Sequence, residues 1–225
     1  MPISAIVFDF DGVVLDTETP LYSSWKEMYA RHGAHLDLEL FATYIGGADY
    51  FDFHAHLQEQ TGLTFDRQSL MDERRALYRK HVSGNTVLPG VKDYLREARR
   101  RGCGIGMASN SDIGWVGSNL RELGLFDEFD VLKTRDDVVH VKPDPEIYLA
   151  ALHDLMTDPS HAIAIEDSAS GVAAAKSAGL FTVAVPNPIT RFHNLDDADV
   201  ILGSLASTSF GDLAELALSR LEQSA

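Results

Sequence analysis

The first fourteen residues constrain this chain more than any other stretch. Residues 3–14 form an apolar, β-branched run that carries Asp9 and Asp11, one residue apart, followed by Gly12. The pattern predicts a buried strand with polar chemistry at its carboxyl end, and a side-chain period of two would put both aspartates on one face. Gly12 lets the chain turn sharply. Because unpaired carboxylates are costly to bury, the stretch implies a metal ion or a cationic side chain nearby.

Composition narrows the class of protein. The 225 residues are enough for one large domain or a main domain with an insertion, and 45% hydrophobic residues are ordinary for a soluble globular protein. A net charge of −15 argues against nucleic acid and anionic membranes as partners. The chain has no apolar run of membrane-spanning length and a single cysteine, Cys103. We therefore expect no secretory signal, no intramolecular disulfide and a cytoplasmic location.

The order of helix-like and strand-like patterns predicts the architecture. After about residue 87 strands and helices alternate, which is typical of a parallel sheet, whereas residues 18–85 have helical patterns and no strand run. We therefore predict an α/β fold with a doubly wound, mainly parallel Rossmann-like sheet. Residues 1–17 and 86–225 would form this core domain, and residues 18–85 an inserted all-helical cap domain. One core helix is expected to open with Asp144 as its N-cap and Pro145 at its first position.

Two further polar stretches follow predicted strands or precede predicted helices. Ser109 stands where a strand ends and a helix begins, a natural place for a phosphate, although Ser109 and Ser111 would equally suit a helix cap. Lys142 lies just before a helix start, and the two prolines that follow it, Pro143 and Pro145, limit the freedom of the backbone. A lysine at the positive end of a helix is unfavourable, which suggests that an anion binds there; a solvated surface lysine is the alternative.

A pair of acids, Glu166 and Asp167, follows the apolar run 161–165. Carboxylate oxygens suit a hard cation, and magnesium is typically held by one or two carboxylates with water and phosphate. The alternative is that these acids only complement the dipole of the following helix.

Together, these four stretches resemble, in order, the four motifs of the haloacid dehalogenase superfamily, in its phosphatase and β-phosphoglucomutase-like branch. The matching strings are Asp9-Phe10-Asp11-Gly12, Ser109, Lys142-Pro143-Asp144-Pro145 and Glu166-Asp167-Ser168-Ala169-Ser170-Gly171. The resemblance implies a magnesium-dependent phosphohydrolase that acts on a small phosphorylated metabolite, such as a sugar phosphate, through an aspartyl phosphate, as a monomer or weak dimer.

The resemblance also implies roles for individual residues. Asp9 would be the nucleophile, and Asp11 would protonate the leaving alkoxide and later activate water. Mg²⁺ would be bound by Asp9, the backbone carbonyl of Asp11, Asp167 and, directly or through water, Glu166. The residues implied to bind phosphate or substrate are Gly12, Thr17, Arg74, Ser109, Asn110 and Lys142.

Of three other functions, one remains open and two are disfavoured. Dehalogenases of the superfamily lack the second aspartate, so Asp11 favours phosphate esters. The mutases carry a histidine shortly after the first motif and a basic residue in the next loop, and the matching stretches here, 18–22 and 46–49, have neither. Thr17 does match, and Arg74 or Arg75 could supply the missing charge, so a mutase is the alternative. A module that only binds phosphorylated ligands is disfavoured, because every catalytic position is intact.

Other conspicuous residues are expected to be structural. The aromatic residues of the helical segment are expected to pack, with one or two reaching the substrate: Trp25, Tyr29, Tyr44, Tyr50 and Phe51. His54 and His56 are two apart on a helix, do not face together and are expected at the surface. His140 is nearer the lysine motif but is not counted among the site residues.

Overall fold

The α/β part of the molecule is built on a parallel sheet. The computed structural model describes residues 2–45 and 51–224. In its sheet the strands lie in the order β3-β2-β1-β4-β5-β6, and neighbouring strands of these described residues pair in parallel. The strands are β1 (Ala5–Phe8), β2 (Gly104–Ala108), β3 (Val131–Lys133), β4 (Ala162–Glu166), β5 (Phe181–Ala184) and β6 (Val200–Ile201). The predicted fold class is confirmed.

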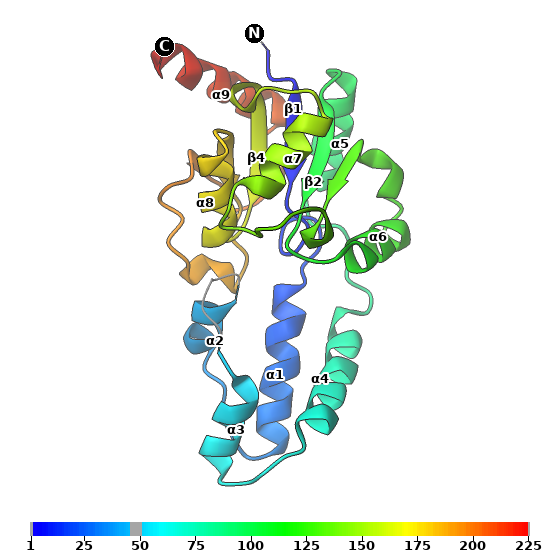
Figure 1. Cartoon of the computed structure of the whole chain (residues 1–225), viewed down its shortest axis with the longest axis vertical. Helices are drawn as coiled ribbons and strands as arrows, with labels where there is room; N and C mark the ends of the chain where they lie inside the picture. Colours follow the sequence, from blue (N-terminus) through cyan, green and yellow to red (C-terminus); the bar gives the residue numbers. More distant parts are fainter. Residues whose placement is uncertain (1, 46–50, 225) are drawn as a thin grey trace.

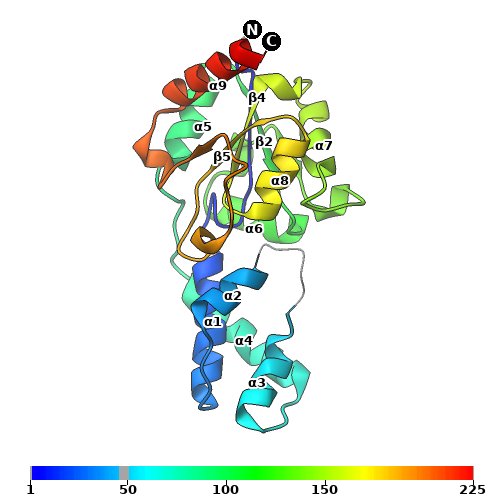
Figure 2. The same cartoon turned by 90° about the vertical axis from the view of Figure 1, so that its left-hand side faces the viewer.

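Helices cover both faces of this sheet (Figures 1 and 2). Ile6 and Phe8 of β1 pack on one side with α5 (Val91–Arg100), α6 (Ile113–Glu122) and α9 (Phe210–Ser224). Ala5 and Val7 point to the other side, toward α7 (Glu146–Asp154) and α8 (Ala169–Ser177). A strand buried on both faces must be apolar throughout, which is why β1 is a continuous apolar run.

The first strand is shorter than predicted. It ends at Phe8, and the Phe10 carbonyl accepts hydrogen bonds from the backbone N–H groups of Val14 and Leu15, so the chain turns at once. Asp9 and Asp11 therefore follow the strand instead of lying in it. The expectation that they share one face of a strand is wrong, because the period of two ends with the strand.

Residues 18–82 form a four-helix segment with its own apolar core, at the carboxyl ends of the strands (Figures 1 and 2). Its helices are α1 (Glu18–Arg31), α2 (Leu38–Tyr44), α3 (Phe53–Thr61) and α4 (Arg67–Val82). Trp25 and Tyr29 are buried in this core, and the Tyr44 and Phe51 rings stack with centroids 4.6 Å apart, so these aromatics pack as predicted. Tyr50 and residues 46–49 lie outside the described residues.

Two local predictions are wrong. His54 is buried and not at the surface, because α3 turns its ring inward, where Nε2 lies 3.3 Å from the Phe65 carbonyl oxygen. Helix α7 begins at Glu146, one position later than expected, so its N-cap is Pro145 and not Asp144. Asp144 precedes the N-cap but still accepts a hydrogen bond from the Glu146 N–H. Cys103 is buried. No helix in the described ranges is long and apolar enough to cross a membrane.

Candidate active site

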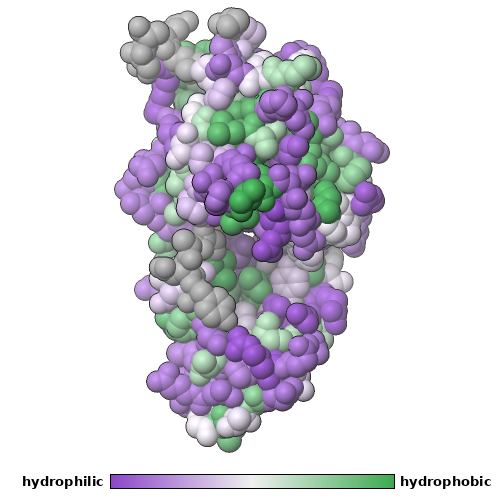
Figure 3. Space-filling model, viewed as in Figure 1, coloured by the Kyte–Doolittle hydropathy of each residue, from purple (hydrophilic) through white to green (hydrophobic). Residues whose placement is uncertain are grey.

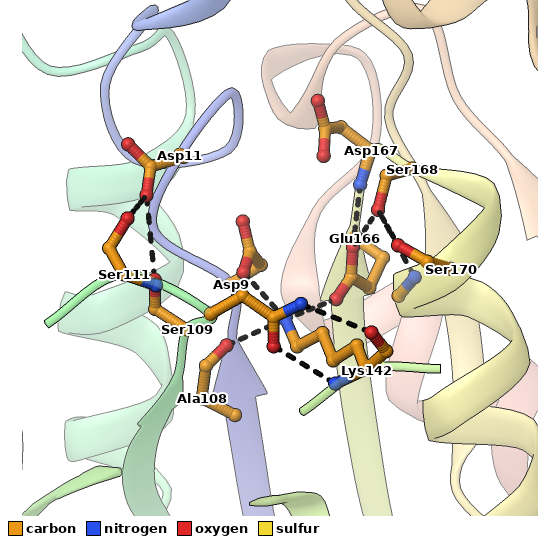
Figure 4. Close-up of polar contacts among 12 residues, drawn as sticks. Asp9, Asp11, Ala108, Ser109, Ser111, Lys142, Glu166, Asp167, Ser168 and Ser170 are labelled. Carbon is orange, nitrogen blue, oxygen red and sulfur yellow. Dashed lines mark hydrogen bonds and ion pairs between the residues drawn. The ribbon is translucent and has the colours of Figure 1, made fainter. Parts of the chain in front are cut away.

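The predicted motifs meet at one edge of the sheet. Asp9 follows β1, Ser109 follows the neighbouring β2, and Glu166 ends β4 on the other side of β1, so parallel strands carry all three to the same edge. Lys142 joins them from the loop before α7 (Figure 4). A cavity of about 450 Å³ opens above them, between the α/β part and the four-helix segment. The surface is hollowed at this junction, and hydrophilic residues border the hollow on the α/β side (Figure 3).

Lys142 is the central cation of the cavity floor. Its side chain is 3% exposed, and Nζ donates to Asp9 Oδ1 and Glu166 Oε1, each at 2.6 Å, and to the Ala108 carbonyl at 2.7 Å. Burial opposes its charge, but the two carboxylates outweigh burial and hold the pKa of Lys142 above its usual value. The positive charge of Lys142, which was predicted to attract an anion, is thus paired with carboxylates of the protein itself.

Asn110 fixes the backbone of this lysine. Its side-chain carbonyl accepts from the Lys142 N–H at 3.0 Å, and its amide donates to the Lys142 carbonyl at 3.2 Å. Both polar groups of the Asn110 side chain therefore hold the loop that carries Lys142. Asn110, which was predicted to bind phosphate, supports Lys142 beside the expected phosphate site.

Three buried carboxylates, of Asp9, Glu166 and Asp167, offer oxygens within 4.8 Å of one another. Burial raises the pKa of Asp9 to about 8; Lys142 opposes this rise, while Glu166 and Asp11 add to it. Burial, followed by the charges of Asp9, Glu166 and Glu18, also raises the pKa of Asp167 well above its usual value. When all three carboxylates are ionised, Lys142 leaves two negative charges uncompensated, which matches the charge of a divalent cation. Oxygen donors of this kind suit a hard cation.

The surroundings of Asp167 are closely fitted. Asn187 donates to its Oδ2 at 2.7 Å. Gly12 has a φ of 79°, and a Cβ atom there would lie 2.2 Å from the same Asp167 oxygen. Any larger residue at position 12 would therefore displace a candidate metal ligand.

Glu166 is held by several donors at once. The Tyr148 hydroxyl donates to Oε1 at 2.6 Å, beside the bond from Lys142, and the Asp167 N–H donates to Oε2 at 3.2 Å. Glu166 thus orients Lys142 as well as contributing to the acidic group.

Asp11 turns away from Asp9, toward the loop that follows β2 (Figure 4). Its Oδ2 accepts from Ser111 Oγ at 2.6 Å and from Ser109 Oγ at 3.4 Å, and its Oδ1 accepts from Trp115 Nε1 at 3.0 Å. Ser111 therefore binds Asp11, and Asp112 caps α6 by accepting from the Trp115 N–H.

The opposite wall of the cavity contains Thr17, at the start of the four-helix segment, and three residues within that segment, Glu18, Arg74 and Tyr78. The guanidinium of Arg74 lies 5.6 Å from the ring centroid of Trp25 and 6.0 Å from that of Tyr78. Within the described part of the chain, Thr17 Oγ1, Glu18 Oε2 and Arg74 Nε are buried without a hydrogen-bond partner. Burial, followed by the charges of Asp11, Asp9 and Asp16, raises the pKa of Glu18 to about 8.

The structure brings most of the predicted site residues to the cavity lining: Asp9, Asp11, Thr17, Arg74, Ser109, Asn110, Lys142 and Asp167. Gly12 and Glu166 lie just behind this lining, against Asp167 and Lys142. His140 is exposed and bonds to Glu146, outside the lining.

Sequence reasoning missed several residues of the site. Trp115, Tyr148 and Asn187 bind the predicted acids but belong to none of the motifs. A signal existed for Tyr78, which stands one helical turn after Arg74 and so shares its face. Nothing comparable marked Asn187, which reaches Asp167 only through the tertiary fold.

The chain is similar to known proteins over most of its length. A model of the family described as haloacid dehalogenase-like hydrolase matches residues 3–179. "Putative phosphatase YhcW" of Bacillus subtilis is 42% identical over 204 residues, which cover 91% of this chain and 93% of that protein. "Phosphorylated carbohydrates phosphatase" of Thermotoga maritima is 28% identical over 203 residues, 89% of this chain and 90% of that protein. The crystal structure of a β-phosphoglucomutase from Clostridium difficile superimposes with a TM-score of 0.73 at 26% identity, covering 97% of this chain and 99% of that one.

Proposed function

Because this chain belongs to the haloacid dehalogenase-like hydrolases, we propose that it is a magnesium-dependent phosphohydrolase of small phosphorylated metabolites that works through an aspartyl phosphate. The resemblance read from the motifs is confirmed, and so is the prediction of an enzyme of the phosphoric monoester hydrolase class. The observation that carries the finer proposal is the buried Asp9–Lys142 pair beside two further acids, on the floor of an open cavity.

Asp9 is the proposed nucleophile. Lys142 holds its Oδ1, so we assign the attack on phosphorus to Oδ2. As the new bond forms, the ester P–O bond breaks and the phosphoryl group passes to Asp9. Ser109 and Lys142 would bind the phosphoryl oxygens, because both stand on the lining next to Asp9. In the second half of the reaction, water attacks phosphorus and inorganic phosphate leaves, which regenerates Asp9.

Asp11 is the proposed general acid and base. It lies on the same cavity lining as Asp9 but is held by different donors, so the two aspartates can serve different roles. It would give its proton to the leaving oxygen and then take one from the attacking water.

The acidic group fits the proposed magnesium ion, because its three buried carboxylates exceed the charge of Lys142 by two. Asp9, Asp167 and the Asp11 backbone carbonyl would hold the ion, with Glu166 direct or through water. When bound, magnesium would neutralise charge on the phosphoryl group. Asn187 and Gly12 support this assignment, since together they fix the position of the Asp167 carboxylate.

The four-helix segment is proposed to act as a cap that binds the leaving group. Support comes from its placement over the cavity and from the polar atoms of Glu18 and Arg74, which are buried there without partners. Arg74 would donate to oxygens of the leaving group. We propose a sugar phosphate or a similar phosphomonoester as the substrate, since one relative is named as a phosphatase of phosphorylated carbohydrates.

The alternative remains a mutase of the β-phosphoglucomutase type, which the structural similarity to such an enzyme favours. The cavity wall disfavours a mutase. Glu18 and Leu21 of α1 lie on the lining, and none of the described histidines does.

The test is a screen of phosphorylated metabolites that measures released phosphate, with magnesium and with excess chelator. We expect turnover with magnesium and its loss on chelation; full turnover in chelator would contradict the metal assignment. With β-glucose 1-phosphate, phosphate release should exceed glucose 6-phosphate formation. The opposite ratio would establish the mutase.

Two further parts of the proposal concern the protein in the cell. We propose a cytoplasmic location, where a lone buried thiol such as Cys103 stays reduced. A monomer or weak dimer is proposed, and light scattering across a range of protein concentrations measures this.

A further inference from the structure

The carboxylate of Asp11 is clamped on both oxygens by donors of different kinds. Trp115 Nε1 binds Oδ1, whereas the hydroxyls of Ser111 and Ser109 bind Oδ2. Each carboxylate oxygen has about two acceptor positions, so Oδ2 is filled while both hydroxyls bind it. The contact with Ser109 is long, at 3.4 Å, and is given up when Ser109 binds the phosphoryl group, which opens Oδ2 to the substrate oxygen or to water.

The difference between the donors has a chemical consequence. An indole N–H can only donate, whereas a hydroxyl can rotate and accept. A proton on Oδ1 would compete with the Trp115 N–H, but a proton on Oδ2 can be accommodated by rotation of the Ser111 hydroxyl. We infer that Trp115 is a positioning residue that keeps the proton of Asp11 on Oδ2. This inference rests on the proposed role of Asp11 as general acid and base.

Oδ2 is also the oxygen that the reaction needs. It lies 3.4 Å from Ser109 Oγ, the hydroxyl proposed to bind the phosphoryl group, so it is the Asp11 oxygen on the phosphate side. The proton passes from Oδ2 to the ester oxygen as the P–O bond breaks and Asp9 bonds to phosphorus. In the second half, water gives a proton back to Oδ2 as its oxygen bonds to phosphorus and the bond between phosphorus and Asp9 breaks. Because Trp115 holds Oδ1, the carboxyl group does not rotate between the two halves.

Trp115 is held through both its backbone and its ring. The Trp115 backbone N–H donates to Asp112 Oδ1 at 2.8 Å in the first turn of α6. The ring of Tyr78, from the four-helix segment, packs on it with centroids 5.9 Å apart. A ring held in this way can set the orientation of a carboxylate.

The kinetic test compares two esters in the first turnover. An alkyl phosphate needs a proton on its leaving oxygen, whereas 4-nitrophenyl phosphate hardly does. In Trp115→Phe an aromatic ring is kept, although a smaller one, and the N–H is lost. Phosphoenzyme formation from the alkyl ester should slow about 10- to 100-fold, what one hydrogen bond to a charged group is worth, and far less from the nitrophenyl ester. Ser118→Ala is the control, because it removes an exposed donor of the same helix that bonds only to backbone carbonyls of α6, and it should leave the ratio of the two rates unchanged.

A double variant separates positioning from shape. In an Asp11→Ala background Trp115→Phe should slow the alkyl ester no further, because its effect acts through Asp11. Equal slowing of both esters by Trp115→Phe, or an additive loss in the double variant, overturns the inference. If wild-type protein hydrolyses neither ester nor any metabolite in the screen, it is the proposed function that fails.

The hydrogen bond can be tested without turnover. The two indole N–H signals in an NMR spectrum are assigned with Trp25→Phe and Trp115→Phe. In Asp11→Ala, the Trp115 signal should move upfield while the Trp25 signal stays in place. An unmoved Trp115 signal would mean that this bond is absent, and the inference would fall.

Discussion

The floor and the wall of the cavity satisfy their polar groups in opposite ways. On the floor, which the α/β part provides, Lys142, Glu166 and Asp11 are each held by two or more donors or acceptors of the protein. On the wall, at the four-helix segment, buried polar atoms of Glu18 and Arg74 have no hydrogen-bond partner within the described residues. A buried polar group without a partner costs stability, so such groups persist where a ligand completes them.

The contrast assigns different tasks to the two regions. The floor is organised before any substrate arrives, which is what charge stabilisation in phosphoryl transfer requires. The wall is completed by the leaving group. Changes on the floor should therefore slow the overall turnover of all substrates, because every substrate passes through the same phosphoenzyme, and changes on the wall should alter which substrates are preferred.

The largest effect should follow from Asp9→Asn, which breaks the floor. An amide cannot form the acyl phosphate, so we expect turnover of every ester to fall by about 10⁴-fold or more. Released phosphate measures this, and circular dichroism checks that the fold is retained. Turnover at the wild-type level would reject Asp9 as the nucleophile.

Asp11→Ala should have the next largest effect, and one that depends on the leaving group. Loss of the general acid should slow phosphoenzyme formation from an alkyl phosphate by about 10²–10⁴-fold, but far less from 4-nitrophenyl phosphate. The phosphoenzyme should then accumulate with the nitrophenyl ester, because the base that activates water is missing too. Rapid-quench measurements follow both steps. Equal loss with both esters would mean that Asp11 acts through metal binding or folding.

The floor was more predictable from sequence than the wall for a physical reason. Asp9, Ser109 and Glu166 each stand at the end of an apolar strand, and parallel strands bring such ends to one edge whatever the loops do. Arg74 was predicted to bind substrate, as one of two neighbouring arginines that could supply charge from the cap. Tyr78 and Trp115 were missed, because their contact joins a helix of the inserted segment to one of the core. The end of β1 at Phe8 was also missed, since the turn depends on bonds to the Phe10 carbonyl and not on apolar pattern.

A smaller effect is expected from Arg74→Gln on the wall. The variant removes a cation but leaves the floor intact, so KM for the preferred metabolite should rise about 10-fold, while kcat for 4-nitrophenyl phosphate changes little. Arg75→Gln is the matched control, because Arg75 is exposed and pairs with Asp72, away from the cavity. If the two variants had the same KM, the wall would not recognise the leaving group through Arg74.

The smallest effect concerns Glu18 and the pH dependence of stability. Burial and the neighbouring acids raise its pKa from 4.5 to about 8 in the folded chain. Between those values the folded state keeps a proton that the unfolded state has lost, so this group makes stability fall as pH rises. Glutamine cannot ionise. The melting temperature of Glu18→Gln should therefore exceed that of the wild type by an amount near zero at pH 4.5 that grows to a few degrees above pH 8. Calorimetry in chelator measures this without metal at the nearby acids, and the exposed Glu59→Gln is the control. A difference in melting temperature that stays constant across this range would mean that Glu18 ionises on the wall as it does in water. Its carboxyl group would then carry no proton that it could donate to a leaving group.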